Sequence, residues 1–299
     1  MTIGGLLVNT YQKKPDWLKK QLSTDVDFFH TEQYLKKLQI NTICVEAKCP
    51  NRWECWAERT ATFLILGKFC TRDCLFCGTK HSSNGEAPID ETEKILEAIK
   101  IFNLDYVVIT SVTRDDLEDG GASYFIKLMQ EIKSFNKNIK IELLTPDFKG
   151  NLEAIKSILL TEPDVFAINI ETVKSFYSLI RPASDYKRIL DIIAFTREYK
   201  KDQIIKSSLI IGLGESFNEI INTLQDLKYA GCNIVAIGQY LQPTKKQVSV
   251  NRYYTPEEFA KLKDIGEELS LTIASSPFTR TSYKAKEVYE ECIKNLKQF

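Results

Sequence analysis

Residues 61–77 read Ala61-Thr-Phe-Leu-Ile-Leu-Gly-Lys-Phe-Cys70-Thr-Arg-Asp-Cys74-Leu-Phe-Cys77, an almost continuous apolar run followed at once by three closely spaced cysteines. A run that is apolar at nearly every position predicts a strand covered on both faces, as in a parallel sheet. Runs of this kind recur about every 30 residues, with an amphipathic helical segment in each interval. The alternation predicts repeated βα units around a parallel sheet.

Seven short apolar runs are the expected strands: 62–66, 106–110, 140–144, 165–170, 204–211, 234–239 and 271–274. The helices expected between them are 91–102, 123–135, 151–160, 186–199, 218–230 and 256–269. Their apolar residues recur at i, i+3, i+4 and i+7, the period of one helix face. The last helix opens with Thr255-Pro256, an N-cap followed by proline at the first helical position.

Periodicity alone leaves two α/β architectures open. Six or seven βα units fit a fully or partly closed barrel, and they also fit an open doubly wound sheet. Either architecture places functional residues at the C-terminal ends of the strands. Residues 1–60 do not follow the alternation, so we expect them to be an extension packed on the units rather than a separate domain.

The composition excludes several classes of protein. The chain has 299 residues and a formal net charge of zero, which argues against nucleic-acid binding driven by counterion release. No apolar run approaches the ~20 residues of a membrane-spanning helix. The first residues show neither a basic start nor a long apolar stretch, so no secretory signal is expected. These observations predict a cytoplasmic protein in a reducing compartment, with no nucleic-acid or membrane partner.

Six of the eight cysteines form two groups of three, which in a reducing compartment favours metal ligation over disulfides. The first group is C-x4-C-x5-C (Cys44, Cys49, Cys55), and the second is C-x3-C-x2-C (Cys70, Cys74, Cys77). A structural zinc site needs four closed ligands, whereas three cysteines suit a cubic iron–sulfur cluster with one iron open. His81 is a weak candidate for a fourth ligand, so a zinc site stays as the alternative.

The second group resembles that of the radical S-adenosylmethionine (SAM) enzymes, because the aromatic Phe76 directly precedes Cys77. The resemblance implies a [4Fe–4S] cluster on Cys70, Cys74 and Cys77 whose open iron binds SAM. Reductive cleavage of SAM would then give a 5′-deoxyadenosyl radical, chemistry that belongs to the cofactor. A low-potential donor such as ferredoxin or flavodoxin would supply the electron.

The first group, placed before the radical motif, resembles that of the lipoyl synthases. The resemblance covers nearly the whole chain, in segments 14–18, 61–67, 110–121, 144–148, 181–182, 238–243 and 280–283. It implies a (βα)6-type partial TIM barrel over 61–275, an N-terminal extension (1–60) that carries an auxiliary cluster motif, and a C-terminal tail (276–299) that closes that cluster. The auxiliary [4Fe–4S] cluster would be held by Cys44, Cys49, Cys55 and Ser282.

The function implied is lipoyl synthase activity. Two sulfur atoms would enter at C6 and C8 of an octanoyl group bound to a carrier protein, with the auxiliary cluster as their source. Cys70, Cys74, Cys77 and Ser282 are then the catalytic candidates. Ile168 and Lys284 stand where the family usually has histidine, and Lys245-Lys246 stands where it commonly has a lysine–histidine pair. The alternatives are another two-cluster radical SAM enzyme, a paralogue with lost specificity, and a non-catalytic zinc-binding protein.

Polar and glycine residues near the strand ends are candidates for binding SAM: Thr110, Ser111, Asn169, Glu171, Gly212, Gly214, Glu215 and Gln239. For the glycines the competing interpretation is a plain βα turn, and for Asn169 and Glu171 it is a structural hydrogen-bond network. Arg280 is expected to pair with a carboxylate near the auxiliary cluster. Lys68 and Arg72 are expected at the surface, where they could attract an acidic electron donor.

Overall fold

The computed structural model describes residues 13–20 and 25–297, and the expectation about the first residues of the chain lies outside these ranges. Seven strands form one sheet in the order β1-β4-β5-β6-β7-β8-β9, and every neighbouring pair is parallel. They are β1 (Thr62–Ile65), β4 (Tyr106–Ser111), β5 (Lys140–Leu144), β6 (Val165–Ala167), β7 (Ile204–Ile211), β8 (Ile234–Gln239) and β9 (Thr272–Ser275). The expected parallel sheet is therefore confirmed, with β1 and β9 at its two edges.

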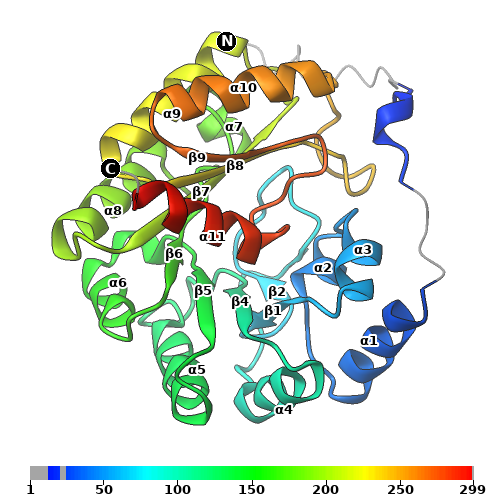
Figure 1. Cartoon of the computed structure of the whole chain (residues 1–299), viewed down its shortest axis with the longest axis vertical. Helices are drawn as coiled ribbons and strands as arrows, with labels where there is room; N and C mark the ends of the chain where they lie inside the picture. The colour runs from blue at the N-terminus through cyan, green and yellow to red at the C-terminus, as the bar shows by residue number, and fades with distance from the viewer. Residues whose placement is uncertain (1–12, 21–24, 298–299) are drawn as a thin grey trace.

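Six helices alternate with these strands and cover the outer face of the sheet (Figure 1). They are α4 (Thr92–Phe102), α5 (Ala122–Phe135), α6 (Leu152–Leu159), α8 (Tyr186–Tyr199), α9 (Phe217–Ala230) and α10 (Pro256–Glu268). Capping boxes fix the starts of α9 (Ser216 with Glu219) and α10 (Thr255 with Glu258). The arrangement is an α/β partial barrel, as the family resemblance implied.

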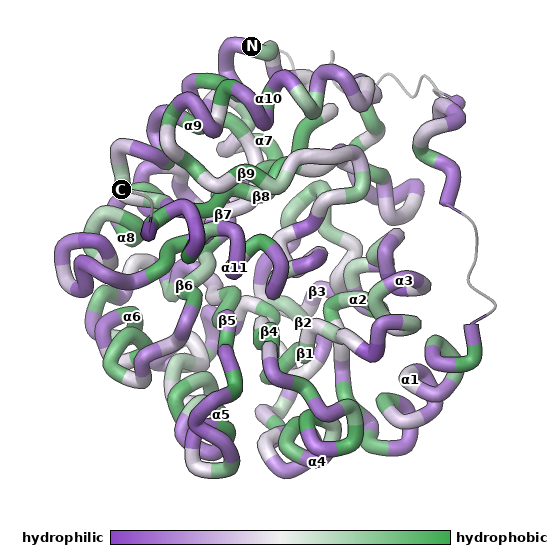
Figure 2. Tube along the Cα trace, in the orientation of Figure 1, coloured by the Kyte–Doolittle hydropathy of each residue, from purple (hydrophilic) through white to green (hydrophobic). Residues whose placement is uncertain are grey.

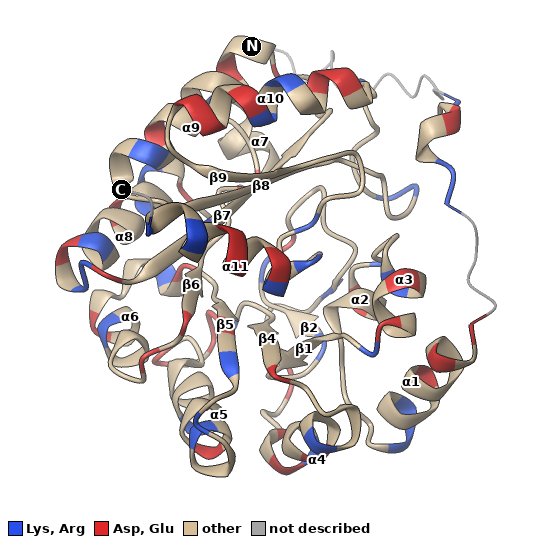
Figure 3. Ribbon diagram, in the orientation of Figure 1, with Lys and Arg blue, Asp and Glu red and all other residues tan. Residues whose placement is uncertain are grey.

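Hydropathy and charge follow this architecture. The strands are mostly hydrophobic in Figure 2, and in Figure 3 the charged residues gather on the outer helices. A buried ion pair interrupts the apolar interior, with Lys206 Nζ 2.9 Å from a Glu142 carboxylate oxygen. No helix in the described part of the chain is both long and apolar enough to cross a bilayer.

The strand expected over 165–170 is shorter in the structure. β6 ends at Ala167, and Glu171 takes a positive φ of 66°, a left-handed conformation that an extended strand does not contain. The segment still pairs with the sheet at one point, where Glu171 forms an isolated bridge to Leu209. The apolar residues Ile168 and Ile170 made the strand pattern in the sequence continue to residue 170, but the backbone leaves the strand after Ala167.

The N-terminal extension lies beside the β1 edge of the barrel (Figure 1). It contains the 3-10 turn η2 (Asp16–Leu18) and helices α1 (Val26–Lys37), α2 (Ile43–Glu46) and α3 (Arg52–Ala57). Phe28 on α1 stacks on Trp53 of α3, with ring centroids 4.3 Å apart. A bridge between Thr42 and Phe63 joins the extension to β1.

The C-terminal helix α11 (Ala285–Leu296) packs against the end of the sheet where the strands begin. Its residues Val288 and Cys292 form one apolar cluster with Val165, Ile204 and Ile234, the first residues of β6, β7 and β8. The remaining short elements are η3 (Phe148–Gly150), η4 (Lys174–Phe176), α7 (Tyr177–Ile180) and the parallel pair β2 (Phe69–Cys70) and β3 (Lys80–His81).

Candidate active site

A cavity of about 880 Å³ is lined from the starts of β1 and β4 (Thr62, Tyr106) to the C-terminal strand ends at Ser111 and Asn169. Its lining includes both cysteine groups and the predicted ligand Ser282: Cys44, Cys49, Cys55, Cys70, Cys74, Cys77 and Ser282. The lining also includes strand-end residues on β4 (Thr110, Ser111) and those that follow β6 (Asn169, Glu171). The two cysteine motifs therefore line one cavity, although different parts of the chain carry them.

The second cysteine group lies on the loop that follows β1, and its backbone is fastened to the neighbouring loops. Thr71 donates its backbone N–H to the Thr113 carbonyl at 2.9 Å. The Thr71 hydroxyl accepts the backbone N–H of Asp115, also at 2.9 Å. On its other side, the N–H of Leu75 bonds to the Ile180 carbonyl at 3.0 Å. These contacts hold the loop at both ends of the Cys70–Cys74 interval.

The expectation that Arg72 lies at the surface is wrong. Its guanidinium is buried and makes two hydrogen bonds to the Asp115 carboxylate, at 2.7 and 2.9 Å. A further bond of 2.6 Å reaches the fully buried Asp147. Asp115 lies in the loop after β4, and Asp147 lies in the loop after β5. Arg72 therefore ties the cysteine loop to two neighbouring loops and is not exposed to an incoming electron donor.

The Arg72–Asp147 pair gives stability that depends on pH. Burial acts to raise the pKa of Asp147, but the hydrogen bond and charge of Arg72 outweigh it and lower that pKa to about 2. The ionised form thus stabilises the fold above the ordinary pKa of 3.8, and this contribution is lost as the pH falls toward 2. Asp147→Asn should lower the free energy of unfolding by about 2 kcal/mol at pH 7, and by less at pH 3.

Urea unfolding of the wild type and of Asp147→Asn, at pH 7 and at pH 3, measures the difference in their free energies of unfolding. Asp191→Asn is the matched control, because Asp191 forms an exposed i,i+4 pair with Lys187 on α8. Such surface pairs are worth less than about 1 kcal/mol. A penalty for Asp147→Asn that stays constant from pH 7 to pH 3 would show that the ionised pair is not its origin.

The first cysteine group lies in the N-terminal extension: Cys44 in α2, Cys55 in α3, and Cys49 between these helices. Burial and the neighbouring thiols raise the pKa of Cys44 to about 11 and of Cys55 to about 12. Burial likewise raises the pKa of Cys74 to about 11 in the second group. Thiols in such surroundings ionise only when a cation compensates the negative charge, as a metal or iron–sulfur cluster does.

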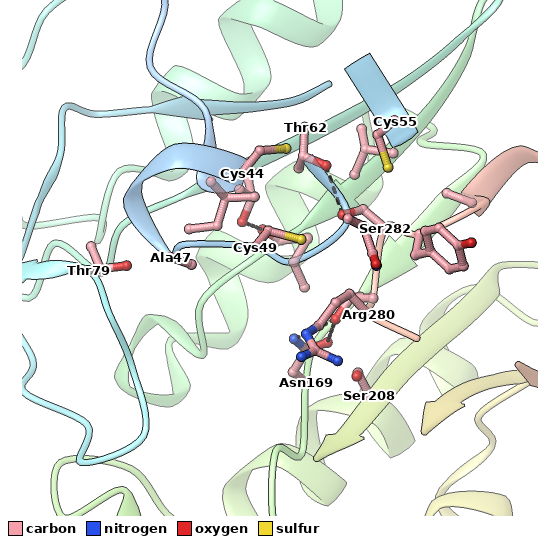
Figure 4. A pocket seen from close by; sticks show the side chains of 18 of the residues that line it. Cys44, Ala47, Cys49, Cys55, Thr62, Thr79, Asn169, Ser208, Arg280 and Ser282 are labelled. Atoms are coloured by element: carbon pink, nitrogen blue, oxygen red, sulfur yellow. Dashed lines mark hydrogen bonds between the residues drawn. The ribbon is translucent and has the colours of Figure 1, made fainter. Parts of the chain in front are cut away.

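The C-terminal tail is fastened to the N-terminal extension on both sides of Ser282. Asn51 donates its side-chain N–H to the Phe278 carbonyl at 2.7 Å. Tyr283 donates its hydroxyl to Glu54 at 2.6 Å, and Lys20 bonds to the same carboxylate. Figure 4 shows Ser282 on the same side of the pocket as Cys44, Cys49 and Cys55. These contacts place a serine oxygen beside three thiols more than 220 residues away in the sequence.

Two half-buried arginines, Arg181 and Arg280, line the cavity near Glu171. Arg181 donates to the Asn169 carbonyl at 3.1 Å, and its Nε has no hydrogen-bond partner among the described residues. Arg280 donates to the Thr279 carbonyl at 2.6 Å, and no ion pair is found for it in the described ranges, contrary to the expected carboxylate partner. Burial raises the pKa of Glu171, although the charge of Arg181 and the hydrogen bond from Asn169 oppose this rise.

The predicted SAM-binding residues divide into three sets. Asn169 and Glu171 line the cavity, and so do Thr110 and Ser111. The Ser111 hydroxyl is buried without a partner in the described part of the chain, as a ligand-binding group would be. Gln239 also lines the cavity, but its amide is bonded to the backbone of Ile211, Tyr240, Arg252 and Tyr254. Gln239 is therefore a structural residue of the cavity wall, and its amide is already bonded within the protein.

The third set, Gly212, Gly214 and Glu215, does not line the cavity. The Glu215 carboxylate accepts the backbone N–H groups of Gly212, Leu213 and Gly214 at 2.5 to 3.1 Å. It therefore closes the turn after β7 instead of facing a ligand. A β-carbon on Gly212 would lie 2.1 Å from the Gln239 amide, so this glycine is required by packing. His81, on β3, is exposed and outside the lining.

Two residues that line the cavity, Arg181 and Thr62, were not predicted from the sequence as site residues. In the sequence Arg181 belongs to a segment that resembles the family, and Thr62 is the first residue of an expected strand. A polar residue at the first position of an otherwise apolar strand is a signal for Thr62, which is buried and whose hydroxyl donates to Ser282 Oγ at 2.8 Å. Arg181 shows no comparable signal, because its orientation depends on the segment between β6 and α7.

The donor set fits two cubic clusters. A [4Fe–4S] cluster takes each cysteine at a separate iron, so its ligands need not converge on one ion. Within the described ranges, no group of three or more His, Cys, Asp or Glu side chains is arranged around a single metal ion. Each cysteine group offers three thiols, and the first also has a nearby serine oxygen.

The chain is similar to known proteins over most of its length. A family model described as the radical SAM superfamily matches residues 64–227. Lipoyl synthase from Chlorobium phaeobacteroides is 46% identical over 280 residues, covering 93% of this chain and 97% of that protein. Lipoyl synthase from Caldicellulosiruptor bescii is 41% identical and covers 97% of this chain and 99% of that protein.

Solved structures show the same fold at low sequence identity. HydG, a maturase of the [FeFe]-hydrogenase, has a TM-score of 0.59 and 14% identity, and the match covers 90% of this chain and 67% of HydG. Methylornithine synthase (PylB) has a TM-score of 0.54 and 14% identity, with 83% and 75% covered. At this identity the likeness shows the fold alone, and it agrees with the partial barrel described above.

Proposed function

The chain belongs to the lipoyl synthase family of radical SAM enzymes. We propose that each of its two cysteine groups holds one of two clusters, and that sulfur insertion needs both. The protein is a sulfur-inserting enzyme, and its superfamily uses a [4Fe–4S] cluster and SAM. When bound, these cofactors supply a 5′-deoxyadenosyl radical that removes hydrogen from unactivated carbon, and a second cluster would supply sulfur. The chain's own residues hold, orient and enclose these groups.

Cys70, Cys74 and Cys77 are the proposed ligands of the radical cluster. Arg72 and Thr71 hold their loop in place before any cluster binds, so little loop ordering is left to the binding step. Next to them, Ser111, Asn169 and Glu171 offer polar groups to SAM, with Thr110 beside them on β4. For Gly212, Gly214 and Glu215 a contact with SAM stays a prediction that the cavity lining does not support.

Cys44, Cys49, Cys55 and Ser282 are the proposed ligands of the auxiliary cluster. The observation that carries the proposal is the convergence of these four residues in the cavity that also contains the radical motif. A serine oxygen is a harder ligand than a thiolate and suits iron less well, so its corner is the weakest of the cluster. A weakly held corner suits a cluster that gives up its own sulfide.

The octanoyl substrate would be bound to a lysine of a carrier protein and reach the space between the two cysteine groups. Apolar wall residues such as Val108, Ile168 and Ile210 suit an alkyl chain and exclude water from the radical. A low-potential reductant such as ferredoxin or flavodoxin would supply electrons. We propose the division into 1–60, 61–275 and 276–299 on the same grounds, and the cytoplasm as the compartment.

Iron and acid-labile sulfide contents test the two-cluster proposal. After anaerobic reconstitution the wild type should contain about eight of each per chain, because each cubic cluster contributes four. Changing Cys44, Cys49 and Cys55 to alanine should leave about four, since the second group is unchanged. The measurement is a colorimetric assay for iron and sulfide, with zinc measured in parallel.

Other iron or zinc contents would contradict parts of this proposal. About four irons in the wild type would leave a one-cluster radical enzyme and would contradict the sulfur-donor mechanism. Zinc without iron would contradict the assignment of both clusters. Replacing the lone buried Cys232, which bonds to the Ile205 carbonyl away from the cavity, is the matched control and should leave the iron content unchanged.

A further inference from the structure

The side chain of Thr62, the first residue of β1, lies between two of the proposed auxiliary ligands. Its hydroxyl donates a hydrogen bond to Ser282 Oγ at 2.8 Å. Figure 4 shows the dashed bond between Thr62 and Ser282, with Cys44 and Cys55 on either side of it. Thr62 therefore lines the same cavity as the three thiols and contacts the serine oxygen of that ligand set.

Packing alone does not explain a hydroxyl at this position. Thr62 is buried, and it begins a strand whose other residues are Phe63, Leu64 and Ile65. Valine has the same branched shape and would suit such a strand without a polar group to satisfy. The cost of burying the hydroxyl is offset by its bond to Ser282, which links β1 to the C-terminal tail.

The direction of the bond matters for a serine that ligates iron. A serine oxygen bound to a metal has lost its proton, so it can accept hydrogen bonds and cannot donate them. Thr62 keeps its own proton and supplies the donor. Hydrogen bonds to charged acceptors are shorter and stronger than those between neutral groups. The observed arrangement is therefore the one that favours Ser282 in its ligating form.

We propose that Thr62 is a positioning residue that holds Ser282 Oγ at the fourth corner of the auxiliary cluster and limits the loss of iron from that corner. The inference rests on the proposed two-cluster function and assigns to Thr62 a role that the ligand set alone does not require. Hydrogen-bonding partners of metal ligands orient those ligands, and their removal typically weakens metal binding by about 10–100-fold. The tail contacts of Asn51 and Glu54 bring Ser282 close, and Thr62 fixes the oxygen itself.

The test compares iron release from reconstituted holoenzymes that contain both clusters. In the presence of an excess of a ferrous chelator, Thr62→Val should lose its first iron at least about tenfold faster than the wild type. Thr62→Ser keeps a hydroxyl and should stay within about threefold of the wild type. Thr196→Val is the matched control, because the buried Thr196 hydroxyl on α8 has no partner among the described residues and lies outside the cavity.

A second pair of variants separates loss of the Thr62–Ser282 hydrogen bond from a general weakening of the fold by Thr62→Val. In a Ser282→Cys background the fourth ligand is a thiolate, which iron prefers. There, Thr62→Val should no longer accelerate iron release. Equal release rates in the wild type and Thr62→Val would overturn the inference while leaving the two-cluster proposal intact. Equally fast release in Thr62→Ser and Thr62→Val would also overturn it. A wild type with four irons would overturn both proposals.

Discussion

Cys74→Ala should reduce the formation of 5′-deoxyadenosine to background, whereas Cys49→Ala should leave that reaction and abolish formation of the lipoyl product. Cys74 lies in the loop held by Arg72, and Cys49 lies in the extension held to the tail. Removing one of three cluster thiols leaves an iron without its protein ligand, so each variant disables one cluster. The cavity joins the two sites in space, but their supporting contacts come from different segments.

The measurement is anaerobic turnover with SAM, a chemical reductant and an octanoylated carrier domain, with 5′-deoxyadenosine and thiolated product quantified together. Cys292→Ala is the control, because Cys292 is buried in α11 at the opposite end of the strands. Lipoyl product from Cys49→Ala would show that the auxiliary cluster is not the sulfur source. Loss of both products in Cys49→Ala would favour an electron-transfer role for that cluster, as in the alternative two-cluster enzyme.

Where hydrophobic pattern and turn chemistry act on the same local segment, the sequence predicted the fold closely. The expected strands 140–144, 204–211 and 234–239 and the helix 186–199 have the observed bounds. In each, apolar periodicity ends at polar or glycine residues. The strand at 165–170 was predicted too long because its apolar pattern continues past the point where Glu171 adopts a left-handed backbone. Burial of Ile168 and Ile170 does not require them to lie in a strand.

The cysteine motifs of the site were predicted from the sequence, but the long-range contacts that bring its residues together were not. The spacing of each cysteine group could be read locally, but the position of Ser282 beside the first group depends on contacts of Asn51 and Glu54 with the tail. Those contacts are more than 220 residues apart in the sequence. Arg72 was misplaced for the same reason. Its acidic partners belong to other loops, so its neighbours in the sequence gave no sign of burial.

Inside the barrel, Glu142 and Lys206 form a buried pair that stabilises the fold rather than the cavity wall. They lie on β5 and β7, alternate strands of the sheet, as inward-facing residues of a barrel layer do. Both side chains are at most 1% exposed, and both carboxylate oxygens lie 2.9 Å from Lys206 Nζ. The Tyr106 hydroxyl also donates to Glu142 at 2.9 Å. The carboxylate thus has two donors and no contact with water.

Lys206→Met should destabilise the protein by about 3–5 kcal/mol, because it leaves the Glu142 charge buried without its cation. The expected fall in thermal midpoint is about 10 °C for a chain of this size. Adding Glu142→Leu should recover part of the loss, since an apolar pair of similar volume is often as stable as a buried ion pair. Recovery should be complete only when Tyr106→Phe is added, because the tyrosine hydroxyl otherwise loses its acceptor. Calorimetric melting of the wild type and the three variants checks the expected order of their thermal midpoints.

A Lys206→Met protein with the same thermal midpoint as the wild type would mean that Glu142 binds water or a proton in place of the lysine. The buried pair would then contribute little to holding β5 and β7 together.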